Sequence, residues 1–247
     1  MHRWLGSRAR SAVFAPIGDL GRAAGVERRL DEAIRSGVLH DGERLPSEAE
    51  LANLFGVAVV TAREALVGLR SNGLITTVRG RGGGSFVRGP VGPDETELRA
   101  WLASMSRVDL ADRGVHYSVV MTGCAELAAE RATPDDVADL RGLLAGLGSD
   151  AVSVVRQADT ELHLALAALT RSARLSREVM SLEIDFGLLL RLPLVTPDSR
   201  RRLVDDAVAV VDAVEQRDPD TARDVMRLRV RRALGDVAEL RTEVSRP

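Results

Sequence analysis

The sequence predicts a mostly α-helical chain in two parts: an N-terminal part of three short helices and a hairpin, and a C-terminal all-helical bundle. Three observations predict this class. Residues 26–73 contain short stretches with apolar residues at helical spacing, each ended by glycine. Two short strand-like runs flank a glycine-rich turn within residues 74–87. Beyond residue 94 only helical patterns remain.

Length and composition suit a globular protein with two domains. The 247 residues fit two domains of roughly 100–150 residues each. The apolar runs are shorter than the roughly 18 residues of a membrane helix, and the basic first ten residues precede no stretch of signal-peptide length. A single cysteine, Cys124, excludes an intramolecular disulfide and a multi-cysteine metal site. We therefore expect a cytoplasmic protein with no membrane partner.

The charges are distributed unevenly along the chain. Residues 1–90 carry 13 arginines against 9 acidic residues, and residues 91–247 carry 21 against 27. A basic N-terminal part beside an acidic C-terminal part places any contact with nucleic acid in the first part.

The first part begins with a loose tail, residues 1–18, expected to be disordered, and continues as a domain over residues 19–89. A first helix is predicted near residues 26–36. Ser47 can cap a second helix over residues 48–55, because Glu50 lies three positions later and can complete a capping box. Gly56 supplies a tight turn, and a third helix runs from Val59 to a stop at residues 72–73. Two short helices joined by a glycine turn form a helix-turn-helix.

A β-hairpin, or wing, should follow the third helix, which makes the first domain a winged helix-turn-helix. Its strands are predicted over residues 74–78 and 85–87. Arg79, Arg81 and Gly82 lie in the turn between them, where arginines supply positive charge and glycine lets the backbone approach a phosphate. Residues 90–94, rich in Pro and Gly, predict a linker between the domains.

The second domain, residues 95–243, is predicted to be helical throughout. Thr133, Thr196 and Asp218 each precede a proline, which is the pattern of a capping residue followed by a first-turn proline. The predicted helices cover residues 95–105, 110–131, 134–147, 152–169, 174–192, 198–216 and 219–240.

Residues 45–87 resemble the winged helix-turn-helix of the GntR family of bacterial regulators. The resemblance rests on Leu45-Pro46-Ser47-Glu48, Leu51-Ala52, Phe55-Gly56-Val57, Thr61-Ala62-Arg63-Glu64-Ala65-Leu66, Leu69, Gly73-Leu74-Ile75 and residues 82–87. It implies that the third helix enters the major groove of double-stranded operator DNA, with Arg63 as the leading base contact. The implied DNA-binding residues are Ser47, Val59, Val60, Thr61, Arg63, Arg70, Arg79, Arg81 and Gly82. Ala49 and Val59 stand where the family commonly has Arg, so fewer charged base contacts are expected.

The second domain resembles the all-helical FCD domain of the FadR subfamily. Residues 125–132, the pair Asp159 and His163, and residues 212–226 carry the resemblance. Such domains commonly hold a divalent metal through one Asp and three His and bind an organic acid. Asp159 and His163 fit the first two ligand positions, but the others fall on Ala207 and Arg229, which cannot ligate a cation. We therefore expect no cofactor, with a divalent metal at Asp159 and His163 kept as an alternative.

Arg229 suggests that a guanidinium replaces the metal's positive charge, either by pairing with Asp159 or by holding a carboxylate effector. Tyr117 and Arg191 are further candidates for the effector pocket. Asp112 and His116 form a second pair with the same four-residue spacing, which would complete a displaced metal site if both pairs faced one cavity.

Together these features indicate a homodimeric transcriptional regulator, a repressor by the commoner logic among relatives, whose operator affinity depends on a small organic or fatty acid. No catalytic residue is expected. One alternative is an enzyme of metal-assisted hydrolysis, although the sequence contains no nucleophile elbow or phosphate loop. Another is a DNA-binding or architectural protein whose helical domain binds no ligand and only dimerises.

Overall fold

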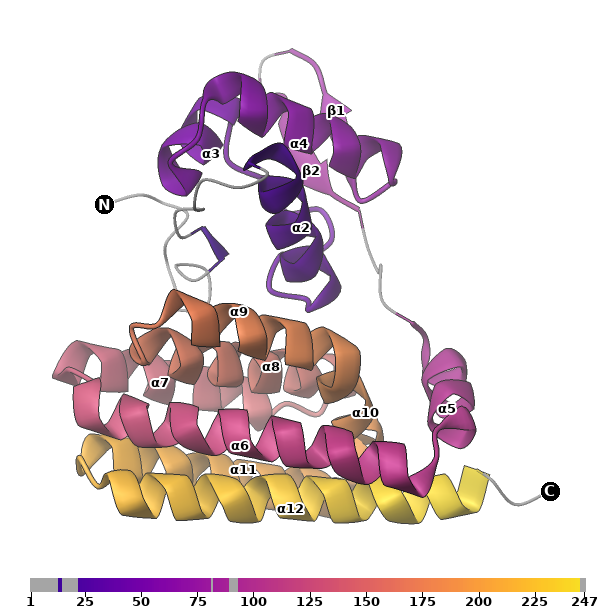
Figure 1. Cartoon of the computed structure of the whole chain (residues 1–247), viewed down its shortest axis with the longest axis vertical. Coiled ribbons are helices and arrows are strands. Elements are labelled where there is room, and N and C mark those ends of the chain that lie inside the picture. The colour runs from indigo at the N-terminus through magenta and orange to yellow at the C-terminus, as the bar shows by residue number, and fades with distance from the viewer. Residues whose placement is uncertain (1–12, 15–21, 81, 89–92, 245–247) are drawn as a thin grey trace. The chain divides into compact units, whose positions relative to one another are not determined.

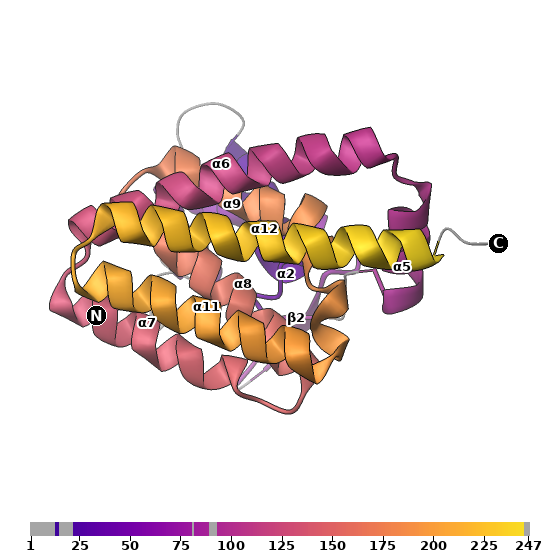
Figure 2. The same ribbon diagram turned by 90° about the horizontal axis from the view of Figure 1, so that it is seen from below.

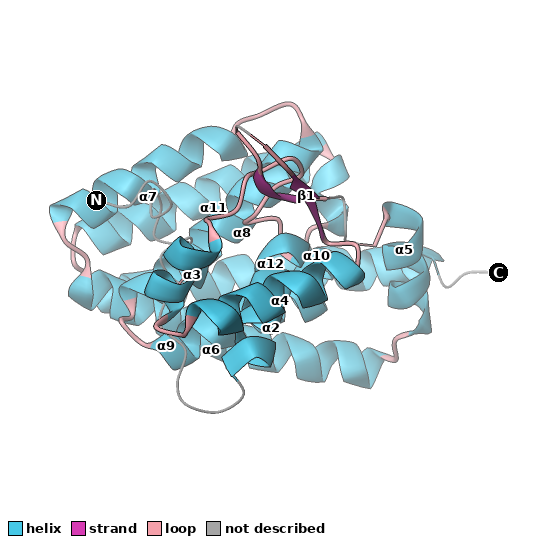
Figure 3. Cartoon of the chain, turned by 90° about the horizontal axis from the view of Figure 1, so that it is seen from above, coloured by secondary structure: helices cyan, strands magenta, loops and turns pink. Residues whose placement is uncertain are grey.

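The computed structural model describes residues 13–14, 22–80, 82–88 and 93–244, which fall into two compact units. The units are residues 1–92 and 93–247, so the division lies inside the linker expected at residues 90–94 (Figure 1). The structure is mostly α-helical with one small sheet, as the sequence predicts (Figure 3). Within the described part, no single helix is both long and apolar enough to cross a membrane.

The first unit is a winged helix-turn-helix. Helices α3 and α4 meet at 110° across Gly56, which has the left-handed φ of +67° that favours glycine. Strands β1 and β2 pair antiparallel, with Ile75 opposite Val87 and Val78 opposite Gly84. The elements are α2 (Arg22–Arg35), α3 (Glu48–Phe55), α4 (Val59–Ser71), β1 (Ile75–Val78) and β2 (Gly84–Val87).

Apolar side chains from all three helices form the core of this unit. Leu30, Leu51, Phe55 and Leu69 are fully or almost fully buried. Two residues of the expected disordered tail join them: Val13 and Phe14 are buried, and the Phe14 ring packs on Phe55 with centroids 5.8 Å apart. The expectation of a loose tail is therefore wrong at these two positions, where aromatic burial holds the chain. The rest of that tail lies outside the described residues.

The second unit is a bundle of helices, and most bounds agree with the prediction to within three or four residues. Figure 2 shows α12 running between α6 and α11. The helices are α5 (Glu95–Ser104), α6 (Arg107–Arg131), α7 (Pro134–Leu147), α8 (Val152–Leu169), α9 (Ala173–Leu182), α10 (Leu188–Leu190), α11 (Pro197–Glu215) and α12 (Pro219–Val244).

The single helix predicted over residues 174–192 is broken in the structure. A π-helical turn, η1 (Glu183–Gly187), separates α9 from α10, and a 3-10 turn, η2 (Leu192–Val195), follows. A π-helical turn such as η1 inserts an extra residue into a helix, and such turns are frequent at functional sites. Here the break brings two charged side chains, Glu183 and Arg191, into the interior, where they form an ion pair.

Candidate functional site

Ser47 begins α3 in the way the sequence predicts. Its hydroxyl accepts a hydrogen bond from the Glu50 amide at 3.3 Å, and the Glu50 carboxylate accepts one from the Ser47 amide at 2.8 Å. This reciprocal pair is the predicted capping box. Ser47 thus fixes where α3 starts, and with it the position of Glu48 on the surface.

The N-terminal turn of α4 presents the residues expected to contact DNA. Val59, Val60 and Arg63 are exposed, and Thr61 is half-buried. Ala58, which precedes α4, has no side-chain acceptor, so the first amides of α4 are left for an outside acceptor. An uncapped helix start favours negative charge such as a phosphate.

Arg63 is held by a partner that the sequence reasoning missed. Its Nε and Nη2 both lie 2.9 Å from Oε2 of Glu48, the first residue of α3. The hydrogen bond and the charge of Glu48 raise the pKa of Arg63. The pair joins the starts of the two helices and favours one direction of the guanidinium, although both side chains are exposed to solvent. Fifteen residues separate the partners, and this spacing is not a recognisable sequence signal.

The remaining predicted phosphate contacts lie at the wing and the end of α4. Arg70 donates to the Thr77 hydroxyl at 3.0 Å, which ties α4 to β1. Arg79 is exposed, and Gly82 has a φ of +87°, the left-handed conformation expected for a glycine turn. Arg81 lies outside the described residues.

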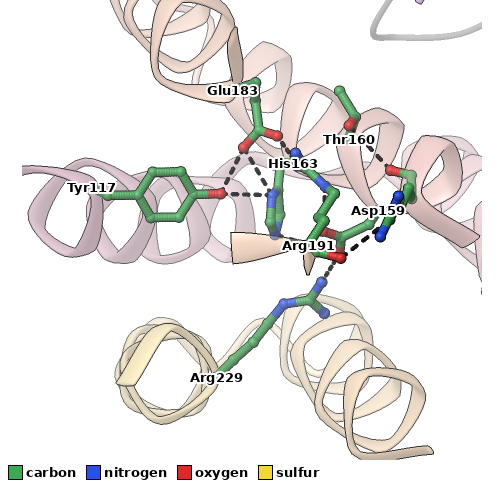
Figure 4. A network of polar contacts seen from close by, with 8 residues as sticks. Tyr117, Asp159, Thr160, His163, Glu183, Arg191 and Arg229 are labelled. Atoms are coloured by element: carbon green, nitrogen blue, oxygen red, sulfur yellow. Dashed lines mark hydrogen bonds and ion pairs between the residues drawn. The ribbon is translucent and has the colours of Figure 1, made fainter. Parts of the chain in front are cut away.

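The second unit contains a cluster of six polar residues that we call the buried network. Each is at most 4% exposed, although two of them are carboxylates and two are guanidinium groups. They come from segments far apart in the sequence, namely α6, α8, η1, α12 and the end of α10 (Figure 4). The members are Tyr117, Asp159, His163, Glu183, Arg191 and Arg229.

Guanidinium groups occupy both carboxylate oxygens of Asp159. Arg191 Nε donates to Oδ2 at 2.9 Å, and Arg229 Nη2 donates to Oδ1. The pairing of Arg229 with Asp159 is one of the two arrangements expected from the sequence. Burial raises the pKa of Asp159, but the positive charges of His163, which is protonated only in acid, of Arg229 and of Arg191 outweigh it and lower the pKa to about 2.

Glu183, which the sequence reasoning did not identify, organises the other half of the network. Its carboxylate accepts hydrogen bonds from the Tyr117 hydroxyl at 2.6 Å and from Arg191, and its Oε1 lies 3.0 Å from His163 Nδ1. Gly187 makes room for this arrangement, because a Cβ there would lie 2.8 Å from a Glu183 oxygen and 2.9 Å from Arg191 Nη1. A glutamate within an apolar helix gives no sequence signal of this role.

His163 is neutral and keeps one ring nitrogen as a hydrogen-bond acceptor. Burial lowers its pKa to about 3, because a charged ring is disfavoured away from water. Since Nδ1 faces a carboxylate, it carries the ring proton, and Nε2 keeps a lone pair. Nε2 lies 3.9 Å from Asp159 Oδ1 and has no hydrogen-bond partner among the described residues.

A cavity of about 50 Å³ adjoins the network and has room for a few water molecules or one carboxyl group. Tyr117, Asp159, His163 and Arg229 line it, together with apolar side chains such as Leu194. Ala207 is buried on α11 and is not a lining residue, whereas its neighbour Asp206 is.

Three buried nitrogen atoms of the network are unsatisfied. His163 Nε2, Arg191 Nη1 and Arg229 Nη1 make no hydrogen bond within the described part of the chain. Buried polar atoms normally have partners, and an exception often marks the place of a missing ligand or water. Two of the three are positively charged donors, which complement an anion.

The donor set around Asp159 does not fit a divalent cation. Guanidinium groups already hold both of its oxygens, and His163 is the only other family ligand in place. No group of three or more His, Cys, Asp or Glu suited to a metal occurs among residues 13–14, 22–80, 82–88 and 93–244. His116 pairs with Glu178 at 3.0 Å on the surface, so the alternative in which Asp112 and His116 complete the site is wrong.

Family models match both units. The model described as "Bacterial regulatory proteins, gntR family" matches residues 22–86, and the FCD domain model matches residues 119–232. The protein named as an HTH-type transcriptional regulator, RmpR of Mycobacterium gastri, is 32% identical over 225 residues, covering 90% of this chain and 82% of the relative.

Two further proteins are similar over most of their length. The HTH-type transcriptional repressor NanR of Salmonella newport is 28% identical over 235 residues, which are 87% of this chain and 85% of the relative. The solved structure of McbR/YncC of E. coli superposes with a TM-score of 0.53 at 19% identity, covering 90% of this chain and 99% of that one, and shows the shared fold. The chain belongs to the GntR family of bacterial regulatory proteins, and it is a DNA-binding transcriptional regulator with an effector-binding FCD domain.

Proposed function

We propose that the chain represses transcription from a two-fold symmetric operator and releases it when a small carboxylic acid binds beside the buried network. The acid is held by the Arg229 guanidinium and needs no metal. The protein acts as a cytoplasmic homodimer, and its function is binding, not catalysis. The relative NanR is named a transcriptional repressor, which supports repression over activation.

The observation that carries the proposal is that two residues lining the cavity, His163 and Arg229, each have an unsatisfied nitrogen atom. A carboxylate can accept from Arg229 Nη1 in a charge-assisted hydrogen bond. The lone pair of His163 Nε2 can accept from a hydroxyl or amine of the same ligand. A divalent cation would instead have to displace two guanidinium groups from Asp159.

The small volume of the cavity supports coupling between the ligand and the rest of the unit. About 50 Å³ holds the head of an acid but not its remainder. Apolar wall residues such as Leu194 must therefore move when an acid enters. A ligand that binds one arrangement of the bundle better than another shifts the equilibrium between them, which changes operator affinity through linkage.

The test combines operator release with thermal stability. An operator is first selected from random duplexes, and a panel of carboxylic acids is then screened with and without a chelator. We expect at least one acid to raise the melting temperature and release the operator equally well in both conditions. Arg229→Gln should weaken this response at least ten-fold, whereas Arg201→Gln, at an exposed surface pair, should not. Loss of the response in chelator would contradict the metal-free site.

An FCD domain that only dimerises predicts a different result. In that case no acid changes the melting temperature or the operator affinity, although the operator is still bound. The response to acids therefore separates the regulator from the purely architectural alternative.

A further inference from the structure

The cavity beside the buried network reaches the surface between helices α11 and α12. Its inner lining residues, Tyr117, Asp159 and His163, are at most 4% exposed. Two lining residues at the other end, Arg202 on α11 and Arg232 on α12, have half-exposed side chains. Exposure therefore rises from the network toward these two helices, and an effector that reaches the network enters from their side.

Asp206 on α11 places a carboxylate at the inner end of this entrance. It lines the cavity and accepts a hydrogen bond from Arg232. Arg232 approaches from the solvent side, because its side chain is 44% exposed and that of Asp206 is only 11% exposed. Burial raises the pKa of Asp206, although the charges of Arg232 and Arg229 act against the rise. A positive charge inside the cavity would therefore stabilise the buried carboxylate.

An acceptor and a positively charged donor lie close together at the cavity. His163 Nε2 has a lone pair, Arg229 Nη1 has a proton to donate, and neither atom has a partner within the described part of the chain. Both residues adjoin the same atom, Asp159 Oδ1, which lies 3.9 Å from His163 Nε2 and accepts from Arg229 Nη2. A ligand with a negative group beside a donor group can therefore use both atoms.

An α-amino acid matches this arrangement. One carbon atom separates its carboxylate from its ammonium group, so both groups can meet partners that lie side by side. The carboxylate can accept from Arg229, and the ammonium group can donate to His163 Nε2 and to the Asp206 carboxylate. A simple acid brings no donor to His163, and a 2-hydroxy acid brings a donor without the positive charge that Asp206 favours.

The cavity wall between the network and the surface is largely apolar. Leu194, Leu203 and Val230 line it. An apolar side chain of the ligand gains free energy by leaving water against these residues, whereas a charged one would lose its hydration there. The wall therefore favours an amino acid with an apolar side chain.

We propose that the effector is an α-amino acid with an apolar side chain, held by its carboxylate at Arg229 and by its ammonium group at His163 and Asp206. The inference rests on the proposed effector site and names the class of its ligand. Arg232 holds the Asp206 carboxylate until the ammonium group arrives.

The first test compares ligands that differ in one group. Calorimetric titrations of the full chain measure the Kd of alanine, valine and leucine, of the acids that lack their amino group, and of the corresponding 2-hydroxy acids. We expect at least one amino acid to release the operator and to bind roughly ten-fold or more tightly than both of its analogues, because it adds a charged hydrogen bond. An analogue that binds as tightly as its amino acid overturns the proposal.

The second test changes the carboxylate that is expected to hold the ammonium group. Asp206→Asn keeps the size of the side chain, and the ratio of amino-acid affinity to simple-acid affinity should fall roughly ten-fold. The control is Asp236→Asn, which removes the partner of Arg202 at 2.9 Å, at the outer end of the cavity, and should leave the ratio unchanged. An unchanged ratio in a folded Asp206→Asn protein overturns the proposal.

Arg232→Gln provides a change in the opposite direction and covers the case in which Asp206→Asn does not fold. It removes the half-exposed cation that competes for Asp206. The ratio of amino-acid affinity to simple-acid affinity should therefore rise. A ratio that stays the same or falls in the folded variant overturns the proposal.

These outcomes can be separated from failure of the proposed function. Simple carboxylic acids that release the operator as well as the amino acids do overturn this inference and leave the proposed effector site in place. If no carboxylic acid of any of the three kinds releases the operator, the proposed function is refuted and this inference with it.

Discussion

Replacing Glu183 by Gln tests whether the buried network holds the second unit together. The change keeps the shape of the side chain but removes the charge that pairs with Arg191, and it leaves the partners Tyr117 and His163 facing a neutral amide. Removing one member of a buried ion pair costs about 3–5 kcal/mol. We expect about 3 kcal/mol, because the amide oxygen can still accept one hydrogen bond and Arg191 keeps Asp159 at 2.9 Å.

Calorimetry of the full chain measures this cost. A loss of about 3 kcal/mol lowers the melting temperature of a unit of this size by roughly 6–12 °C. The control is Glu178→Gln, which removes a carboxylate from the half-exposed pair with His116 and should cost less than about 1 kcal/mol. Equal melting temperatures for the two variants would refute the stabilising role of Glu183.

Three further predictions concern protonation, packing and DNA discrimination. His163 has its pKa lowered by burial from 6.5 to about 3, so the unfolded chain takes up its proton first as pH falls. Stability should decrease below about pH 6.5 by up to ~1.4 kcal/mol per pH unit, and His163→Gln should flatten this slope in urea titrations; parallel slopes would contradict it. Gly187→Ala should destabilise by about 1–3 kcal/mol, because its Cβ would collide with two charged groups, whereas Gly142→Ala, with open space around it, should be neutral or stabilising. Both changes are measured as shifts of the denaturant midpoint, and shifts of the same sign and size for the two variants would refute the close contact at Gly187. Glu48→Gln should raise the affinity for random duplexes and lower the ratio of operator affinity to random-duplex affinity, because Arg63 loses the carboxylate partner 2.9 Å away that orients it. An unchanged ratio in parallel titrations of the two duplexes would contradict that role of Glu48.

The sequence predicts those parts of the fold that local signals specify. Ser47 and Glu50 lie within one helical turn, and Gly56 occupies a left-handed turn, so both ends of α3 are predicted to the residue. The π-helical turn at residues 183–187 has no such signal, because it depends on an ion pair inside the bundle. Phe14 likewise joins the first core through a contact with Phe55, forty-one residues away, that no local pattern reveals.

The candidate effector site is predictable only where residues share a helix or a family position. Asp159 and His163 are found by their spacing of four residues, and Arg229 by its place at a lost ligand position. Glu183 is missed because its partners are 8 to 66 residues away along the chain. The role of Glu183 in fixing the ring proton of His163 can be recognised only in the folded bundle, where separate helices bring the two side chains together.

The central claim is that α4 enters a DNA groove with Arg63 toward the bases, and a charge reversal at Arg63 tests it most directly. Affinities of the parent, Arg63→Glu and Arg28→Glu are compared on the selected operator and on random duplex at moderate ionic strength. Arg28 is an exposed arginine of the same unit on α2. We expect Arg63→Glu, folded as judged by circular dichroism, to lose at least ten-fold in operator affinity, since one bidentate base contact is worth about 1–3 kcal/mol, and Arg28→Glu to stay within about three-fold of the parent. A folded Arg63→Glu protein that binds both duplexes as tightly as the parent would contradict the claim.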